Sequence, residues 1–291
     1  MIVDCKIIAH ELREELRKKV TASGKKLVLG IFKATSGNEA RDAQTESFLK
    51  QKRACGKDVG IELREYLLDS YMATQKSVED YVQSGVHDKN IGMHAAIIQL
   101  PLPTFLQNGE RVNMQAVLNK IPPEKDADVL HYKSFGRFEA GREGALTPPN
   151  VAAIQEIVKR YAEDMLDLTG KTVVIVGKGH VVGLPVERWT MRFKTAATIT
   201  LDKGSDIGYY THNADFIVSC VGSAGLIRSD MVKDDVVAID FGCSRENGAW
   251  LGDMHVSVAE KARVLTPVPG GVGPVGVAEI FWNVGKLGQI V

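Results

Sequence analysis

A glycine-rich turn at residues 177–183 is the clearest place in this 291-residue sequence where residue type and spacing could do chemistry. It reads Gly177-Lys-Gly-His-Val-Val-Gly183 and follows a strongly apolar run. In such a turn the first glycine permits a tight bend, the second lets the backbone approach a pyrophosphate, and the following helix presents N–H groups to that anion. Glycines also serve strand-to-helix turns for steric reasons alone. The spacing therefore leaves both interpretations open, and the apolar strand before the turn favours dinucleotide binding.

Asp202 is the second candidate for dinucleotide recognition, because it ends the next predicted strand, 25 residues after Gly177. An acidic side chain at that position accepts hydrogen bonds from the ribose hydroxyls of a dinucleotide and repels an added phosphate. The alternative is an ordinary polar residue at a strand end.

A loop near the C-terminus, Thr266-Pro-Val-Pro-Gly-Gly-Val-Gly-Pro274, holds three prolines and three glycines in nine residues. Proline fixes one backbone angle, and glycine permits conformations and close approaches that other residues do not. The composition predicts a conformationally specified loop where backbone could meet a ligand.

Three polar residues elsewhere are less distinctive by position alone. Lys52 stands in a predicted helix, where a lysine is normally a solvated surface residue. Asp128 lies near a strand end and could be a turn residue. Gln99 is harder to dismiss, because it stands within an apolar strand and a buried amide needs specific partners.

The apolar pattern that must position these residues alternates between strands and helices, which predicts parallel βαβ units. In the first half, strands are predicted at 27–32 and 61–68, and residues 94–103 as a third strand that runs into a proline-rich loop, with helices at 8–20, 42–57 and 78–83. In the second half, a helix at 147–165 precedes strands at 171–177, 196–201, 214–220 and 235–240, and a last helix covers 275–287. The second half has the rhythm of a doubly wound sheet.

Composition excludes several classes of protein. Lys plus Arg equals Asp plus Glu, 36 each, which argues against a general nucleic-acid binder. No apolar stretch reaches the roughly 18 residues of a membrane span, and residues 1–10 lack the pattern of a signal peptide. The four cysteines and seven histidines lack metal-ligand spacing, so no metal site is predicted. We expect a soluble protein of a reducing compartment, the cytoplasm.

Several segments together carry a resemblance to a known family. The loop at 266–274 closely resembles the P-V-P-G-G-V-G-P signature of the methylenetetrahydrofolate dehydrogenase/cyclohydrolase family. Four further segments resemble that family in its order: Ser47-Phe-Leu-Lys-Gln-Lys52, Ile98-Gln-Leu-Pro-Leu-Pro103, Ile121-Pro-Pro-Glu-Lys-Asp-Ala-Asp128 and Val176-Gly-Lys-Gly-His-Val-Val-Gly-Leu-Pro185. The resemblance extends from about residue 8 to about residue 287.

The resemblance implies a role for each matching residue. Lys52 matches the lysine implicated in both activities, Gln99 the glutamine that orients it, and Asp128 the acid that anchors the pterin ring. Further folate contacts are implied for Phe48, Pro267, Pro269, Gly270, Gly271 and Gly273. The cofactor contacts implied are Gly177, Lys178, Gly179, Val182, Gly183, Asp202 and Gly204.

The sequence departs from the family pattern beside several of these residues. Phe48 replaces a tyrosine and loses its hydroxyl, and Val129 replaces the glycine after Asp128. Lys178 and Gly179 replace an Arg-Ser pair, and Gly204 replaces a serine, at positions that often hold the extra phosphate of NADP in this family. Either NAD or NADP fits the resemblance, and the lost hydroxyls together with Asp202 favour NAD.

The resemblance implies two α/β domains with a folate cleft between them. The N-terminal domain is predicted at 1–145 and includes the last helix, 275–291, and a Rossmann-like doubly wound domain is predicted at 146–274. The implied function is oxidation of methylenetetrahydrofolate and hydrolysis of the methenyl product, by a homodimer that binds tetrahydrofolate derivatives. Two alternatives are a dehydrogenase without cyclohydrolase activity and a non-catalytic folate-binding paralogue.

Overall fold

The chain forms two compact units in the computed structural model, which describes residues 1–246 and 248–291, without the side chains of residues 40 and 41. One unit consists of Met1–Glu11 and Pro149–Glu279, and the other of Leu12–Pro148 and Ile280–Val291. Two helices, α1 (Cys5–Ser23) and α9 (Val272–Leu287), therefore contain residues of both units. We call the first unit the five-stranded unit and the second the three-stranded unit, after their parallel sheets.

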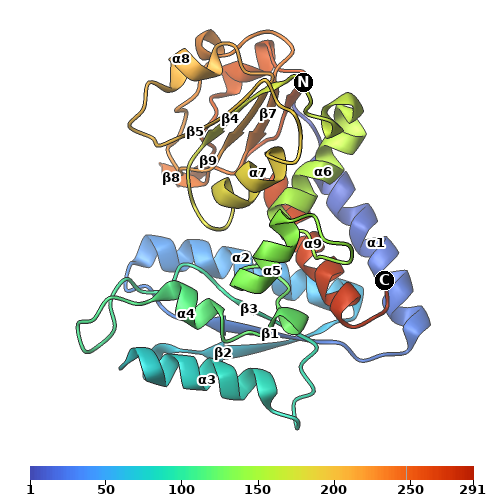
Figure 1. Ribbon diagram of the computed structural model, residues 1–291, viewed down its shortest axis with the longest axis vertical. Coiled ribbons are helices and arrows are strands. Elements are labelled where there is room, and N and C mark those ends of the chain that lie inside the picture. Colours follow the sequence, from blue (N-terminus) through green and yellow to red (C-terminus); the bar gives the residue numbers. More distant parts are fainter. Residues whose placement is uncertain (247) are drawn as a thin grey trace. The chain divides into compact units, whose positions relative to one another are not determined.

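The three-stranded unit is built on a parallel sheet in the order β2-β1-β3. The strands are β1 (Val28–Lys33), β2 (Glu62–Leu67) and β3 (Ala95–Ile98). Figure 1 shows α2 (Glu39–Val59) and α3 (Gln75–His87) on opposite sides of this sheet. The remaining elements are α4 (Met114–Leu118), α5 (Tyr132–Glu139) and the short 3-10 helices η1 (Asp69–Tyr71) and η2 (Pro123–Lys125).

Apolar spacing explains why α3 packs where it does. Its Val78, Val82 and Val86 recur every four residues, so they share one helix face, and all three are fully buried. They join Phe32 of β1 in one core cluster. The helix starts with a capping box between Thr74 and Ser77, which satisfies two backbone N–H groups at that end.

The five-stranded unit contains a parallel sheet in the order β10-β7-β6-β4-β5. Its strands are β4 (Thr172–Val176), β5 (Ala197–Leu201), β6 (Phe216–Ser219), β7 (Val237–Asp240) and β10 (Val264–Leu265). Strands β4, β6 and β7 are neighbours in the sheet, so the residues that follow Val176, Ser219 and Asp240 meet at one carboxyl edge. In open parallel sheets that edge is where ligands bind.

Helices and a hairpin complete the five-stranded unit. They are α6 (Pro149–Tyr161), α7 (Gly183–Thr190), α8 (Ile207–Thr211), η3 (Glu163–Leu166), η4 (Ser229–Met231), η5 (Val256–Glu260) and the antiparallel pair β8 (Ser244–Glu246) and β9 (Ala249–Leu251). Successive side chains of β6 point to opposite faces. Phe216 contacts Trp189 of α7, with ring centroids 6.3 Å apart, while Ile217 packs in a core cluster with Ile207 of α8.

The predicted fold class is confirmed: both units are α/β, and each is built on a parallel sheet. The segment 94–103, predicted as a strand that runs into a proline-rich loop, forms β3 up to Ile98, and a cis peptide bond follows between Leu100 and Pro101. Over the residues that the structure describes, no helix combines the length and apolar character that a membrane crossing requires.

Candidate active site

Lys52 and Gln99 form a buried hydrogen-bonded pair in the three-stranded unit. Lys52 comes from α2 and Gln99 directly follows β3, and their side chains are only 6% and 8% exposed. Lys52 Nζ donates to Gln99 Oε1 over 2.7 Å, and Gln99 Nε2 donates to the carbonyl of Leu100 over 2.9 Å. Because both ends of the amide are bonded, Gln99 presents its oxygen to Lys52 in one orientation.

Asp128 lies close enough to Lys52 for the two charges to interact. Burial lowers the pKa of Lys52, and the negative charge of Asp128 opposes that shift. Burial raises the pKa of Asp128 to about 6, opposed by Lys52 and reinforced by Asp126. Desolvation therefore moves both groups toward neutral pH, the range in which a side chain can take up or release a proton during catalysis.

Phe48 lies on the same face of α2 as Lys52. It precedes Lys52 by four residues, the spacing that places helical side chains side by side, and it is half-buried. An aromatic ring beside a buried amine can stack on a planar ligand.

The backbone beside Asp128 is strained. Val129 has a φ of 59°, which for a β-branched residue is a genuine outlier. Such a conformation costs on the order of 1–3 kcal/mol. The side chain of Val129 is fully buried, and the neighbouring carboxyl of Asp126 is 2% exposed.

The glycine-rich turn depends on glycine at its first and last positions. Gly177 has a φ of 117°, and a Cβ there would lie 2.5 Å from Cys220 Sγ. A Cβ on Gly183 would lie 2.0 Å from the carbonyl oxygen of Gly177, whereas a Cβ on Gly179 would meet nothing within 4 Å. The first and last glycines are therefore needed by the turn itself, and the middle one borders open space. Helix α7 starts at Gly183, and its first-turn N–H groups have partners within the turn: Leu184 donates to the carbonyl of Gly179 over 3.0 Å and Val186 to that of Val182 over 3.0 Å, while Pro185 has no N–H group.

Lys178 and Asp202 form an ion pair beside this turn. Lys178 Nζ lies 3.0 Å from Asp202 Oδ2, and the two side chains are 54% and 68% exposed. Gly204 lies in the turn after β5, and a Cβ there would also meet nothing within 4 Å. The positions matched to phosphate-holding residues thus offer one lysine, which is bonded to an acid.

The proline- and glycine-rich loop is a constrained turn in the five-stranded unit. It contains a cis peptide bond between Val268 and Pro269, and Gly270 has a φ of 90°. A Cβ on Gly271 would lie 2.1 Å from the carbonyl oxygen of Pro267. Gly273 belongs to the first turn of α9.

The structure groups the predicted residues by unit. Lys52, Gln99 and Asp128 come together in the three-stranded unit, which also holds Phe48. The other predicted residues belong to the five-stranded unit, where they lie in the glycine-rich turn, after β5 and in the loop: Gly177, Lys178, Gly179, Val182, Gly183, Asp202, Gly204, Pro267, Pro269, Gly270, Gly271 and Gly273.

Two buried acids at the carboxyl edge were missed by sequence reasoning. Asp253 is fully buried and accepts hydrogen bonds from the Ser219 hydroxyl over 2.7 Å and from the N–H groups of Val221 and Ser223. Asp240 accepts bonds from the N–H groups of Gly242, Asp253 and Met254. These bonds join the loops after β6 and β7 to the segment after β9.

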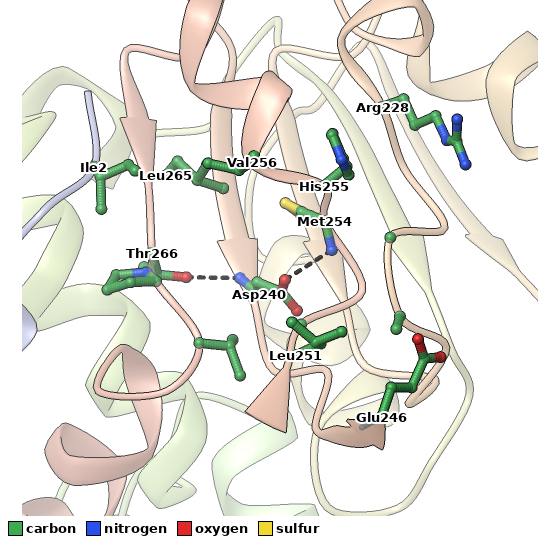
Figure 2. Close-up of a pocket in the computed structure, with 15 residues that line it drawn as sticks. Ile2, Arg228, Asp240, Glu246, Leu251, Met254, His255, Val256, Leu265 and Thr266 are labelled. Atoms are coloured by element: carbon green, nitrogen blue, oxygen red, sulfur yellow. Dashed lines mark hydrogen bonds between the residues drawn. The ribbon is translucent and has the colours of Figure 1, made fainter. Parts of the chain in front are cut away.

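A cavity of about 560 Å³ lies beside Asp240, and Figure 2 shows Asp240 between Thr266 and Met254. Burial raises the pKa of Asp240 to about 7. The sequence feature that could have indicated these two buried acids is the pair of glycines that lie against them. A Cβ on Gly242 would lie 2.3 Å from Asp253, and one on Gly252 would lie 2.1 Å from Asp240.

Comparisons with known proteins match the whole length of the chain. The profile described as "Tetrahydrofolate dehydrogenase/cyclohydrolase, catalytic domain" matches residues 3–128, and its "NAD(P)-binding domain" counterpart matches residues 148–289. The "Bifunctional protein FolD" of Bacillus licheniformis is 33% identical over 288 residues, covering 98% of this chain and 96% of that protein.

Two solved structures are similar throughout. The bifunctional FolD methylenetetrahydrofolate dehydrogenase/cyclohydrolase of Campylobacter jejuni is 28% identical with a TM-score of 0.86, covering 100% of this chain and 99% of that one. The FolD of Trypanosoma brucei, solved with NADP and an inhibitor, is 26% identical with a TM-score of 0.84, covering 99% of this chain and 97% of that one.

Proposed function

The chain belongs to the tetrahydrofolate dehydrogenase/cyclohydrolase family, and from this membership and the site geometry we infer that it is a bifunctional folate enzyme. It oxidises methylenetetrahydrofolate to methenyltetrahydrofolate with a nicotinamide cofactor and hydrolyses the methenyl compound to formyltetrahydrofolate. The observation that carries this proposal is the buried hydrogen bond between Lys52 and Gln99, with Asp128 beside it.

The glycine-rich turn fits the cofactor. The open space over Gly179 leaves room for a pyrophosphate, and the positive end of the α7 dipole favours its charge. When bound, the nicotinamide cofactor supplies the hydride acceptor for the oxidation. The turn residues bind and orient it, which aligns the donor carbon of the substrate with the nicotinamide ring.

Lys52 and Asp128 handle the substrate. Lys52, with its pKa lowered by burial, exchanges protons with the water that attacks the methenyl carbon, and Gln99 keeps its amine in place. Asp128 anchors the pterin ring by accepting bonds from its N–H donors, which is a geometrically selective contact for a carboxylate. Phe48 stacks on the ring system, and the loop from Pro267 to Gly273 contacts the substrate through its backbone.

An absorbance assay tests this function directly. Methylenetetrahydrofolate is supplied with NAD or NADP, and the methenyl product is followed as it forms and then decays. Formation followed by enzyme-dependent decay is the expected result. Formation without such decay would identify a dehydrogenase alone, an alternative favoured by the missing hydroxyl at Phe48. No formation with either cofactor would leave a non-catalytic folate-binding paralogue.

The cofactor preference follows from the ion pair beside the turn. The enzyme uses NAD at least as well as NADP, because Lys178 is bonded to Asp202 and no hydroxyl stands at Gly179 or Gly204. Asp202 accepts from the ribose hydroxyls of NAD and repels the extra phosphate of NADP. The ratio of catalytic efficiencies for the two cofactors measures this preference.

Two further properties belong to the same proposal: the enzyme is a homodimer, and it works in the cytoplasm. Family membership supports both. Sedimentation of the purified protein tests the first, and fractionation of cells that produce it tests the second.

A further inference from the structure

The strained backbone at Val129 needs a physical cause. With a φ of 59°, this residue adopts a conformation that glycine takes readily and β-branched residues avoid. Such outliers persist only where the surroundings over-determine them, and they gather at functional sites. Val129 directly follows Asp128, so whatever holds Val129 also sets the position of Asp128.

The surroundings are fixed on both sides of the strained residue. The N–H group of Ala127 donates to the carbonyl of Ala96 in β3 over 3.3 Å. Asn283 of α9 is 2% exposed, and its Nδ2 donates to the carbonyl of Ala127 over 2.9 Å. These bonds anchor the start of the turn to the sheet and to a helix of the same unit.

Asp126 holds the rest of the turn. Its Oδ2 accepts the N–H group of His131 over 2.8 Å in a buried setting. Burial raises the pKa of this carboxyl, and the N–H group of His131, the hydroxyl of Ser134 and the N–H groups of Leu130 and Val129 all oppose the shift. The buried carboxylate of Asp126 thus faces the backbone of the residues that follow the strained Val129.

We propose that Asp126 is the positioning residue for Asp128, because its carboxylate holds the turn 126–131 in the conformation that places Asp128 beside Lys52. Val129 makes this turn dependent on Asp126, since valine resists the left-handed conformation and glycine would adopt it without help. The proposal deepens the proposed function and rests on the role assigned there to Asp128.

A suppression experiment tests this dependence. The dissociation constants of tetrahydrofolate and NAD are measured for Asp126→Asn, for Asp126→Asn with Val129→Gly, and for Asp126→Asn with Val129→Ala. Asparagine keeps the shape of Asp126 and one accepting oxygen, but it removes the charge and replaces the second oxygen with an NH2 group, which cannot accept a backbone N–H. Glycine removes both the backbone resistance and the packing of valine, whereas alanine removes the packing and keeps a Cβ.

Asp126→Asn should weaken tetrahydrofolate binding by about tenfold or more, which is about 1.4 kcal/mol, while NAD affinity stays unchanged. Adding Val129→Gly should recover at least about threefold of that loss, and adding Val129→Ala should recover none. Unchanged tetrahydrofolate affinity in Asp126→Asn, or equal recovery by glycine and alanine, would overturn the positioning role. Recovery of a foldable protein only in the glycine double variant supports it, and failure of all three variants to fold overturns it.

Asp128→Ala separates the two proposals. Weakened tetrahydrofolate binding in this variant upholds the role of Asp128, whatever Asp126 does. Unchanged tetrahydrofolate binding in Asp128→Ala would rule out the pterin-anchoring role. The affinities of the Asp126 and Val129 variants would then report only on the conformation of the turn 126–131.

Discussion

Lys52 and Gln99 are buried side chains bonded to each other, whereas Lys178 and Asp202 are more than half exposed and pair at the surface. At the first site burial changes the chemistry, because desolvation shifts the pKa of Lys52 and of Asp128 toward neutrality. At the second site, the backbone of the glycine-rich turn determines the shape of the surface. The exposed ion pair beside it contributes only about 0–1 kcal/mol to stability. Under the proposed function, reactivity would depend on burial, and cofactor choice would depend on a weakly held surface charge.

Removing the amine of Lys52 should have the largest effect. Lys52→Met should reduce methenyl hydrolysis by about 10²–10⁴-fold, the usual contribution of a general acid–base group. The fold and NAD binding should persist, because methionine fills a similar volume without a buried charge. Lys50→Met, on an exposed position of the same helix, is the matched control and should hydrolyse normally. Full hydrolysis by Lys52→Met would remove Lys52 from the mechanism.

The pKa of Asp128 should appear in the pH dependence of stability. Burial raises it from 3.8 to about 6 in the folded protein, so the folded state binds more protons than the unfolded state between these pH values. Stability from this group is present at low pH and is lost as pH rises through about 6. Asp128→Asn has no such loss. The difference in stability between this variant and the unchanged protein should therefore grow in favour of the variant from pH 4 to pH 7, by on the order of 2–3 kcal/mol.

Denaturant unfolding of both proteins across that pH range measures the trend. A stability difference that does not change with pH would show that the Asp128 carboxyl has the same pKa in the folded and the unfolded protein, as a solvated aspartate would.

Two glycines of the cofactor turn should respond differently to the same substitution. Gly183→Ala would place a Cβ 2.0 Å from the carbonyl of Gly177, so it should destabilise the protein by about 1–3 kcal/mol. Gly179→Ala meets nothing within 4 Å and should fold normally but bind NAD more weakly, because its methyl group occupies the approach to the pyrophosphate. Thermal unfolding and NAD titration separate these effects. Equal stability of the two variants would contradict the geometry of the turn.

Periodicity predicted strands β1 to β7 and glycine placement predicted the turn after β4, because Val173 to Val176 are apolar and Gly177 follows them directly. Strands β8, β9 and β10 were not predicted, because segments of two or three residues are too short to show a periodic pattern. The pairing of Lys52 with Gln99 was predicted only through family resemblance, since a helix lysine is normally solvated. The strain at Val129 was not predicted, because a backbone angle depends on long-range bonds such as that from Asn283. The Asp240–Asp253 network was missed for the same reason, because its members are distant along the chain. The predicted domain boundaries at 145/146 and 274/275 stay predictions.

The smallest expected effect concerns the surface pair. Asp202→Ser should shift the ratio of catalytic efficiencies toward NADP by about tenfold, or about 1.4 kcal/mol, because it removes a repelling charge and releases Lys178 to meet the phosphate. Adding Lys178→Met to that variant should cancel most of the gain, since the released cation is then gone.

Asp206→Ser is the matched control. It removes a nearby acid that caps α8 through the N–H group of Tyr209, and it should leave the ratio unchanged. If Asp202→Ser leaves the ratio where it was, Asp202 is an ordinary strand-end residue and another group sets the preference. If Asp206→Ser shifts the ratio equally, the effect reflects the general charge of this surface. The proposed contrast between cofactor selection by one surface ion pair and catalysis by a buried pair then fails.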